Sequence, residues 1–187
     1  MTALRHVLLA LQFFTRIPVT GRLAAWVGYS PAMLHASSAH FPGVGWVVGG
    51  VAALVMAGAL AWLPAGPLGA LVAAVLATIA TVWITGAFHE DGLADTFDGL
   101  GGGGAPERRL EIMKDSRIGT YGALGLALAL ALKGAALADL PPGLGAWAIV
   151  AAHAGGRGAS VLAMRRLAYV GHLERGKWKP APAGLAQ

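Results

Sequence analysis

Four apolar segments, each close to the length of a membrane-spanning helix, constrain the fold of this chain most. They run roughly over residues 43–63, 68–88, 123–140 and 144–162. A helix needs about 20 predominantly apolar residues to cross the hydrocarbon core of a bilayer. Prolines stand in the turns that separate the paired segments. The pattern predicts an all-α integral membrane protein: a polytopic bundle of at least four transmembrane helices.

Composition agrees with a chain embedded in lipid. Charged residues make up 12% of the sequence and hydrophobic residues 56%, whereas soluble domains carry about 25% charged residues. The sequence has no cysteine, which excludes disulfides, thiolate nucleophiles and cysteine-based zinc sites. The formal charge of +5 is spread among loops without a basic run, so a lipid bilayer is expected as a partner and nucleic acid is not.

The N-terminus predicts a further helix that stays in the protein. Arg5 precedes the apolar run 7–14, but Arg16 and Pro18 follow that run and no small-residue cleavage site is evident. We therefore expect residues 3–17 to form an interfacial or re-entrant helix rather than a cleaved signal peptide. Because no linker or convincing repeat divides the chain, residues 1–187 are expected to form a single membrane-embedded domain.

The distribution of lysine and arginine predicts the orientation. The turns at 64–67 and 139–143 contain neither residue, whereas the loops on the other side are basic. Basic loops remain on the cytoplasmic side of a membrane. The sequence therefore predicts that residues 89–122, which follow the second apolar segment, face the cytoplasm.

Acidic residues are concentrated in this cytoplasmic stretch. Seven of the nine in the chain fall between residues 89 and 117. A polar loop that is merely solvated would usually mix the two signs of charge, yet residues 89–104 hold four acids and no base. Carboxylates are costly in a lipid-bound chain, and so many oxygens in one stretch predict a divalent cation and phosphate chemistry.

The spacing of three aspartates predicts a metal-binding stripe. If residues 89–99 continue the second spanning helix, Asp91, Asp95 and Asp98 fall within a sector of about 60°. Oxygen ligands suit Mg²⁺ or Mn²⁺. Glu90 could join them if Gly92 breaks the helix. His89 is left open as a ligand, a base or an interfacial histidine with a structural role.

Glycines and mixed charges follow the stripe. The run 99–104 suits either a phosphate-binding backbone or a flexible connector. Glu107, Glu111 and Asp115 recur every four residues, as on a second polar helix, and ordinary ion pairing on a helix surface is expected for the two glutamates. For Lys114, Asp115 and Arg117, the glycine turn at 119–122 indicates a bound anion.

Two basic residues lie inside apolar segments. Lys133 and Arg157 either snorkel to the interface or turn inward toward an anionic substrate. His153 and Arg157 share a helix face at a spacing of four, and Ser160 lies near it, so the inward role is favoured for Arg157. The Gly45-xxx-Gly49 spacing suits close helix packing, either within one chain or between two copies.

The two central motifs resemble the cobalamin synthase family, the adenosylcobinamide-GDP ribazoletransferases. These motifs are HEDGLADTFDGLGGG (residues 89–103) and RRLEIMKDSRIGTYG (residues 108–122). Further similarity lies in LQFFTRIPV (residues 11–19), FPGVGWVVGG (residues 41–50), AHAGGR (residues 152–157) and the stretch 177–180. The resemblance covers nearly the whole chain in order. Family members continue for some tens of residues with further apolar segments, so we expect either a short member or missing C-terminal helices.

The resemblance implies the last step of cobalamin nucleotide-loop assembly in the bacterial inner membrane. α-Ribazole, or its 5′-phosphate, would displace GMP from adenosylcobinamide-GDP with Mg²⁺, or Mn²⁺ as a substitute. Metal ligands would be Glu90, Asp91, Asp95 and Asp98. Catalytic residues would be Asp98 and His89. Substrate-binding residues would be Lys114, Asp115, Ser116, Arg117 and Arg157. A homo-oligomer or association with other enzymes of the pathway is also expected.

Two other classes of protein share parts of this pattern. The stretch Asp95-Thr-Phe-Asp98-Gly99 is similar to part of the CDP-alcohol phosphotransferase pattern, whose downstream arrangement is not reproduced. A membrane cation carrier could use the acidic stripe as its ion site, but its acids would be expected near mid-membrane. The sequence therefore favours the ribazoletransferase over both.

Overall fold

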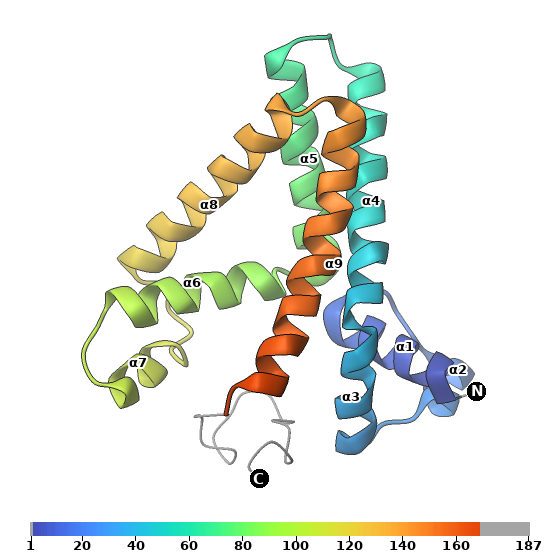
Figure 1. The fold of residues 1–187 in the computed structure, drawn as a ribbon, viewed down its shortest axis with the longest axis vertical. Helices are drawn as coiled ribbons and strands as arrows, with labels where there is room; N and C mark the ends of the chain where they lie inside the picture. The colour runs from blue at the N-terminus through green and yellow to red at the C-terminus, as the bar shows by residue number, and fades with distance from the viewer. Residues whose placement is uncertain (1, 169–187) are drawn as a thin grey trace. The chain divides into compact units, whose positions relative to one another are not determined.

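The computed structural model describes residues 2–168, and all regular structure in that range is helical (Figure 1). The helices are α1 (Thr2–Phe14), α2 (Gly21–Val27), α3 (Pro31–Ser37), η1 (Ser38–His40), α4 (Phe41–Trp62), α5 (Pro67–Thr85), α6 (Phe88–Gly101), α7 (Pro106–Ile112), α8 (Thr120–Asp139) and α9 (Pro142–Arg166). The all-α prediction is confirmed. The stretch 177–180, which carries part of the family resemblance, lies outside the described residues.

Contacts divide the chain into two compact units. Unit 1 comprises residues 1–54 and the chain from residue 146, and unit 2 comprises residues 55–145. The long helices α4 and α9 each contribute to both units. The acidic motif and the loop that follows it both belong to unit 2.

Three helical stretches of the described chain are long and apolar enough to cross a membrane. They are Pro31–Trp62, which joins α3, η1 and α4, together with α5 and α8. The fourth predicted segment forms α9, which is long enough but not among these three. His153, Arg157 and several glycines lower its hydropathy. Composition therefore supports three of the four predicted spans.

In unit 1, α1 packs against α2 and α3 through a small apolar core. Leu9, Val19, Val27 and Leu34 are all buried in it. Two side chains of α1 tie the connecting segments down: Arg5 Nε donates to the Val27 carbonyl oxygen at 2.9 Å, and Gln12 Nε2 donates to that of Val19 at 3.0 Å. The predicted N-terminal helix is present, and it ends at Phe14 rather than at residue 17.

Also in unit 1, α4 and α9 approach at backbone distance through glycine. A Cβ atom built on Gly49 would lie 2.7 Å from the Val150 Cα, and one on Gly45 would collide with the backbone of His153 and Ala154. Helices can approach this closely only where small residues line the contact. The Gly45-xxx-Gly49 pair therefore serves packing within one chain.

In unit 2, a sharp turn separates the acidic helix from the spanning helix before it. Gly86 and Ala87 both adopt left-handed backbone conformations, with φ of 66° and 60°. The Ala87 N–H donates to the Val82 carbonyl oxygen and so closes the end of α5. The stripe prediction supposed that the acidic motif continues the second spanning helix. In the structure it does not. It forms a separate helix, α6, which runs across the direction of α5 (Figure 1).

The third long helix of unit 2, α8, contacts both α5 and α6. The face of α5 that carries Ala73, Ala74 and Ala77 is fully buried. Near its N-terminal end, α8 meets α6 through Gly122 and Gly125. The turn after α4 and the turn after α8 both lack lysine and arginine, and they lie at the same end of this unit (Figure 1). Both turns can therefore lie on the same side of a membrane.

Candidate functional site

In unit 2, the side chain of Asp98 contacts the start of α8. Asp98 is 8% exposed. Its Oδ2 accepts the Gly119 N–H and its Oδ1 accepts the Gly122 N–H, each at 2.7 Å. Gly119 is the N-cap residue of α8, and the first N–H groups of a helix have no partner within it. Asp98 therefore caps α8 from a different helix.

This contact occupies backbone N–H groups of the predicted glycine turn. The turn led us to expect an anion bound by Lys114, Asp115 and Arg117, which stays a prediction, and the Asp98 carboxylate accepts the N–H groups of Gly119 and Gly122. Both glycines are needed there, because a Cβ built on either would collide with the Asp98 carboxylate. Its roles as metal ligand and as base stay predictions. The backbone contacts show a positioning role that sequence reasoning missed.

The other acids of the stripe lie on α6 as the helical spacing predicts. Gly92 remains helical, so Asp91 and Asp95 precede Asp98 on one face. Asp91 and His89 are exposed, and the His89 ring contacts Phe88 edge-on. Among residues 2–168, no three histidine or acidic side chains converge as an all-protein metal cage would require. Mg²⁺ commonly uses one or two carboxylates together with waters and substrate phosphates, so Asp91 and Asp95 suit this cation.

Glu90 lies off that face, about 100° from Asp91 around α6. Its Oε2 atom is buried and has no hydrogen-bond partner among the described atoms. It lies within electrostatic range of Lys133, which is half-buried on α8. This proximity favours an inward-facing Lys133 over snorkelling. Since Gly92 does not break the helix, Glu90 remains off the stripe.

In the loop after α7, the exposed side chain of Arg117 forms an ion pair with Asp115. Helix α7 ends at Ile112, so Asp115 is not on the predicted second polar helix. Asp115 instead accepts from the Arg117 backbone N–H and pairs with its guanidinium, with Nη2 to Oδ2 at 2.7 Å. This hydrogen bond raises the pKa of Arg117 above its ordinary value, so the group stays cationic. On α7, the Arg108–Glu111 pair at 3.0 Å confirms the expected surface ion pairing for Glu111, and for Glu107 it stays a prediction.

A pocket of about 480 Å³ joins this loop to the capped end of α8. We call it the α6–α8 pocket. Its lining residues are Asp98, Gly102, Ile112, Asp115, Arg117, Ile118, Gly119, Thr120 and Tyr121. Lys114 and Ser116 do not line it. Of the predicted substrate-binding residues, the fold thus brings Asp115 and Arg117 together with Asp98.

Arg157 lies in unit 1 and is 3% exposed. Its Nη1 donates to the His153 carbonyl oxygen at 3.1 Å and lies 3.2 Å from His153 Nδ1. The guanidinium also lies 5.4 Å from the Phe14 ring centroid. The shared helix face of His153 and Arg157 is confirmed, while the Ser160 hydroxyl bonds to the Gly156 carbonyl oxygen. A substrate-binding role for Arg157 stays a prediction.

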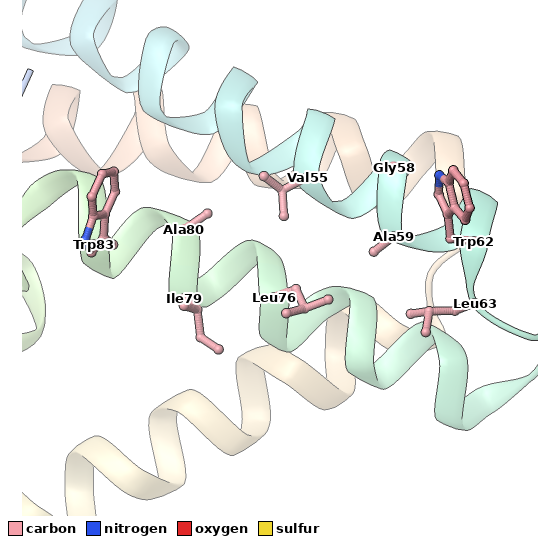
Figure 2. Close-up of a pocket in the computed structure, with 9 residues that line it drawn as sticks. All are labelled: Val55, Gly58, Ala59, Trp62, Leu63, Leu76, Ile79, Ala80 and Trp83. Carbon is pink, nitrogen blue, oxygen red and sulfur yellow. The ribbon is translucent and has the colours of Figure 1, made fainter.

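A second hollow, between the end of α4 and α5, is apolar throughout. It has a volume of about 650 Å³, and Figure 2 shows Trp62 and Trp83 at its two ends. The remaining lining residues are Val55, Gly58, Ala59, Leu63, Leu76, Ile79 and Ala80. It offers no charged group to bind phosphate. Tryptophans at the two ends of spanning helices are typical of the membrane interfaces.

The glycines of the 99–104 run have two different functions. A Cβ built on Gly99 would lie 3.0 Å from the Met113 sulfur, and one on Gly101 would meet the Tyr121 ring. Gly103 and Gly104 have φ of 62° and 92° and form the turn. Gly99 and Gly101 therefore let side chains from other segments pack against the α6 backbone, whereas Gly103 and Gly104 belong to the connector. Both central motifs are rich in glycine, and this is the sequence signal that could have revealed the close packing between them.

Comparison with known proteins shows the family of this chain. A family model described as Cobalamin-5-phosphate synthase matches residues 6–182. An adenosylcobinamide-GDP ribazoletransferase of Polaromonas naphthalenivorans is 53% identical, over 95% of this chain and 69% of its own length. Proteins of the same name from Polaromonas sp. (strain JS666) and Leptothrix cholodnii are 53% and 52% identical, over 98% and 100% of this chain and 71% and 72% of theirs. No solved structure matches. The chain therefore belongs to the Cobalamin-5-phosphate synthase family.

Proposed function

We propose that this chain catalyses the reaction for which its relatives are named, the transfer of adenosylcobinamide phosphate from adenosylcobinamide-GDP to α-ribazole or its 5′-phosphate. The single observation that carries the proposal is identity above 50% over nearly the whole chain to proteins of that name. The products are adenosylcobalamin, or its 5′-phosphate, and GMP.

The chemistry is a displacement at phosphorus. A ribose hydroxyl of α-ribazole attacks the phosphoryl group that is attached to cobinamide, and a new P–O bond forms. The P–O bond to the bridging oxygen of the diphosphate breaks, and the electron pair leaves with GMP. The hydroxyl proton passes to a base on the protein. Catalysis of such a reaction consists largely of positioning the reactants and stabilising the phosphate charge.

The residues of unit 2 suit these tasks. Arg117 is the exposed cation of the α6–α8 pocket, and its pairing with Asp115 holds the guanidinium in place to bind phosphate. Asp98 and His89 remain the two candidate bases; Asp98 lines the pocket, and each of its oxygens keeps a lone pair beyond the one N–H that it accepts. Asp98 also fixes the start of α8, which carries part of the pocket wall.

The donor chemistry also fits a Mg²⁺ requirement. Asp91 and Asp95 would hold the ion, whereas Glu90 lies off their face of α6. When bound, Mg²⁺ would neutralise negative charge that develops on the diphosphate. Mn²⁺ would take the same oxygen ligands.

The proposed setting is the bacterial inner membrane, with the α6–α8 pocket on the cytoplasmic side. Within residues 2–168, three helical stretches are long and apolar enough to span a bilayer, and basic residues surround the acidic motif. The four acids lie on α6, which is not one of those three. This location, together with the names of the relatives, favours an enzyme over a cation carrier and over a CDP-alcohol phosphotransferase.

The metal assignment can be tested by neutralising its carboxylates. Asp91→Asn and Asp95→Asn should each lower Mg²⁺-dependent release of GMP from adenosylcobinamide-GDP by at least about 100-fold, because a positioned charge is worth several kcal/mol in such a transition state. Asp139→Asn, at the opposite end of unit 2, serves as the matched control and should retain activity. The assay measures GMP release by the full chain in membranes.

Two results would contradict these assignments. If the unaltered chain releases no GMP with either acceptor, the proposed function is wrong for this chain. If the chain is active but both substitutions leave the rate and its Mg²⁺ dependence unchanged, the metal site lies elsewhere.

A further inference from the structure

Tyr121 occupies an unusual position on the wall of the α6–α8 pocket. A Cβ built on Gly101 would lie 2.7 Å and 2.8 Å from the Cδ1 and Cδ2 atoms on the two sides of the ring. The ring therefore lies against the backbone of α6, and only glycine at 101 leaves room for it. Tyr121 is nevertheless 58% exposed, so much of the ring surface that α6 does not cover remains open.

A second aromatic contact between α6 and α8 lacks this combination. Phe97 lies on Gly125 in a similar way, and it is 39% exposed. Phe97 does not line the pocket, whereas Tyr121 does. The two contacts use the same glycine packing, but only the first places an aromatic surface beside a cation that can bind phosphate.

The groups around Tyr121 combine apolar walls with one cation. Ile118 is 59% exposed and, with Ile112, supplies aliphatic surface to the pocket. The Arg117 guanidinium belongs to a side chain that is 87% exposed, and it is held by Asp115. Small-molecule sites typically pair apolar and aromatic walls with a few well-placed polar groups, in volumes of about 300–1,000 Å³. This pocket falls within that range.

Asp98 fixes the position of Tyr121 relative to Arg117. Its carboxylate binds the N–H groups of Gly119 and Gly122, which flank Tyr121 in the sequence. The first turn of α8 is thereby fixed against α6. A flat ring that is held in place loses little conformational entropy when another flat ring stacks on it.

We propose that Tyr121 is the stacking platform for the heterocyclic base of a nucleotide or nucleoside substrate, with Arg117 binding the phosphate beside it. The inference rests on the proposed function and deepens it. Besides the adenosyl group on the corrinoid, the reactants carry two flat bases, one in the GMP moiety of adenosylcobinamide-GDP and one in α-ribazole. The shared chemistry is an aromatic base attached to ribose, and binding measurements with each compound distinguish the two sources.

An alternative role for Tyr121 is anchoring the start of α8 at the membrane interface, where tyrosine is enriched. An anchor would affect insertion and stability but not the affinity for a base. Tyr29 is a matched control, because it is 63% exposed and lies in unit 1, whereas the pocket is lined by unit 2. Inorganic pyrophosphate is a matched ligand, because it carries the phosphates without a base.

The test measures direct binding of GMP, α-ribazole and pyrophosphate to the purified full chain by equilibrium dialysis. Tyr121→Leu retains an apolar side chain and should weaken binding of GMP, α-ribazole or both by about 5- to 100-fold, the factor that base–aromatic stacking is worth. Tyr121→Phe should bind like the unaltered protein. Pyrophosphate binding should be unchanged in both variants, and Tyr29→Leu should leave all three affinities unchanged.

Three outcomes overturn the stacking proposal. It is wrong if Tyr121→Leu binds GMP and α-ribazole as tightly as the unaltered chain, if it loses pyrophosphate to the same extent, or if the unaltered chain binds neither base-containing compound. GMP release is measured separately on the same preparations. A chain that binds GMP through Tyr121 but transfers nothing would contradict the proposed function alone, whereas an active Tyr121→Leu variant with unchanged affinities would contradict only the stacking role.

Discussion

The carboxylate of Asp98 accepts two backbone hydrogen bonds at the start of α8, in a cluster where the sequence suggests only ligands and bases. Helical spacing groups Asp98 with Asp91 and Asp95, but it carries no information on which side chain meets another element. The fold separates them: Asp91 is exposed, whereas Asp98 is buried against Gly119 and Gly122. Residues of one type on one stripe can therefore have different roles.

At the residue scale, this predicts a stability effect for one aspartate that its neighbour lacks. Asp98→Ala should lower the free energy of unfolding by about 1–3 kcal/mol, because two N–H groups at the start of α8, of which that of Gly122 is buried, lose their acceptor. Asp91→Ala, at an exposed position of the same helix, should change it by less than about 0.5 kcal/mol. Thermal unfolding in detergent and amide exchange at Gly119 and Gly122 would measure both.

The prediction has a clear counter-result. If Asp98→Ala unfolds at the temperature of the unaltered protein and its Gly119 and Gly122 amides exchange no faster, Asp98 does not cap α8 in the working protein. A role in metal binding would then be the better account of this residue.

At the scale of the elements, glycine decides how closely the helices approach. In unit 1, Gly45 and Gly49 bring the α4 backbone against α9. In unit 2, Gly101 and Gly125 each leave room for an aromatic ring between α6 and α8. Lipid tails are as apolar as the side chains, so close van der Waals packing is a main source of attraction between such helices.

Adding one methyl group at such a contact should therefore be costly. Gly45→Ala should destabilise the protein by about 1–3 kcal/mol, since the new Cβ would collide with the backbone of His153 and Ala154. Gly50→Ala is the matched control on the same helix, because a Cβ atom at that position would have no neighbouring atom within 4 Å. Unfolding temperatures in detergent compare the two, and equal stability would contradict the α4–α9 contact.

At the scale of the whole molecule, charge and hydropathy point to a membrane protein with its chemistry on one side. In the part of the chain that the structure describes, three helical stretches are long and apolar enough to span a bilayer. In unit 2, the turns that lack basic residues lie at the same end (Figure 1), and the acidic helix begins where α5 ends. A single membrane orientation of this unit satisfies both observations.

The absence of native cysteine makes that orientation simple to measure. In intact cells, Ala65→Cys, in the turn after α4, should react with a membrane-impermeant maleimide. Ala105→Cys, in the loop between α6 and α7, should react only after the cells are opened, because the positive-inside rule places that loop in the cytoplasm. Both alanines are exposed, so accessibility is not limited by burial. The reverse labelling pattern would overturn the predicted topology.

The sequence by itself determined the helical class, most helix positions and the family. Apolar segment length, proline position and lysine and arginine placement are local quantities, so they can be read without the fold. The sequence also placed the acids on one helical face, because that spacing depends only on the period of the helix. Its expectation that this helix continues α5 was wrong, since Gly86 and Ala87 together adopt the left-handed conformation.

Only the tertiary structure decided which side chains meet. The contact between Asp98 and Gly119 joins residues 21 positions apart, and the ring of Tyr121 rests on Gly101 of another helix. Such pairs depend on the path of the chain between α6 and α8, which no periodicity encodes. The same physical reason applies to the glycine turn: Gly119 and Gly122 were visible in the sequence, but the carboxylate that accepts their N–H groups belongs to a helix that folding brings beside them.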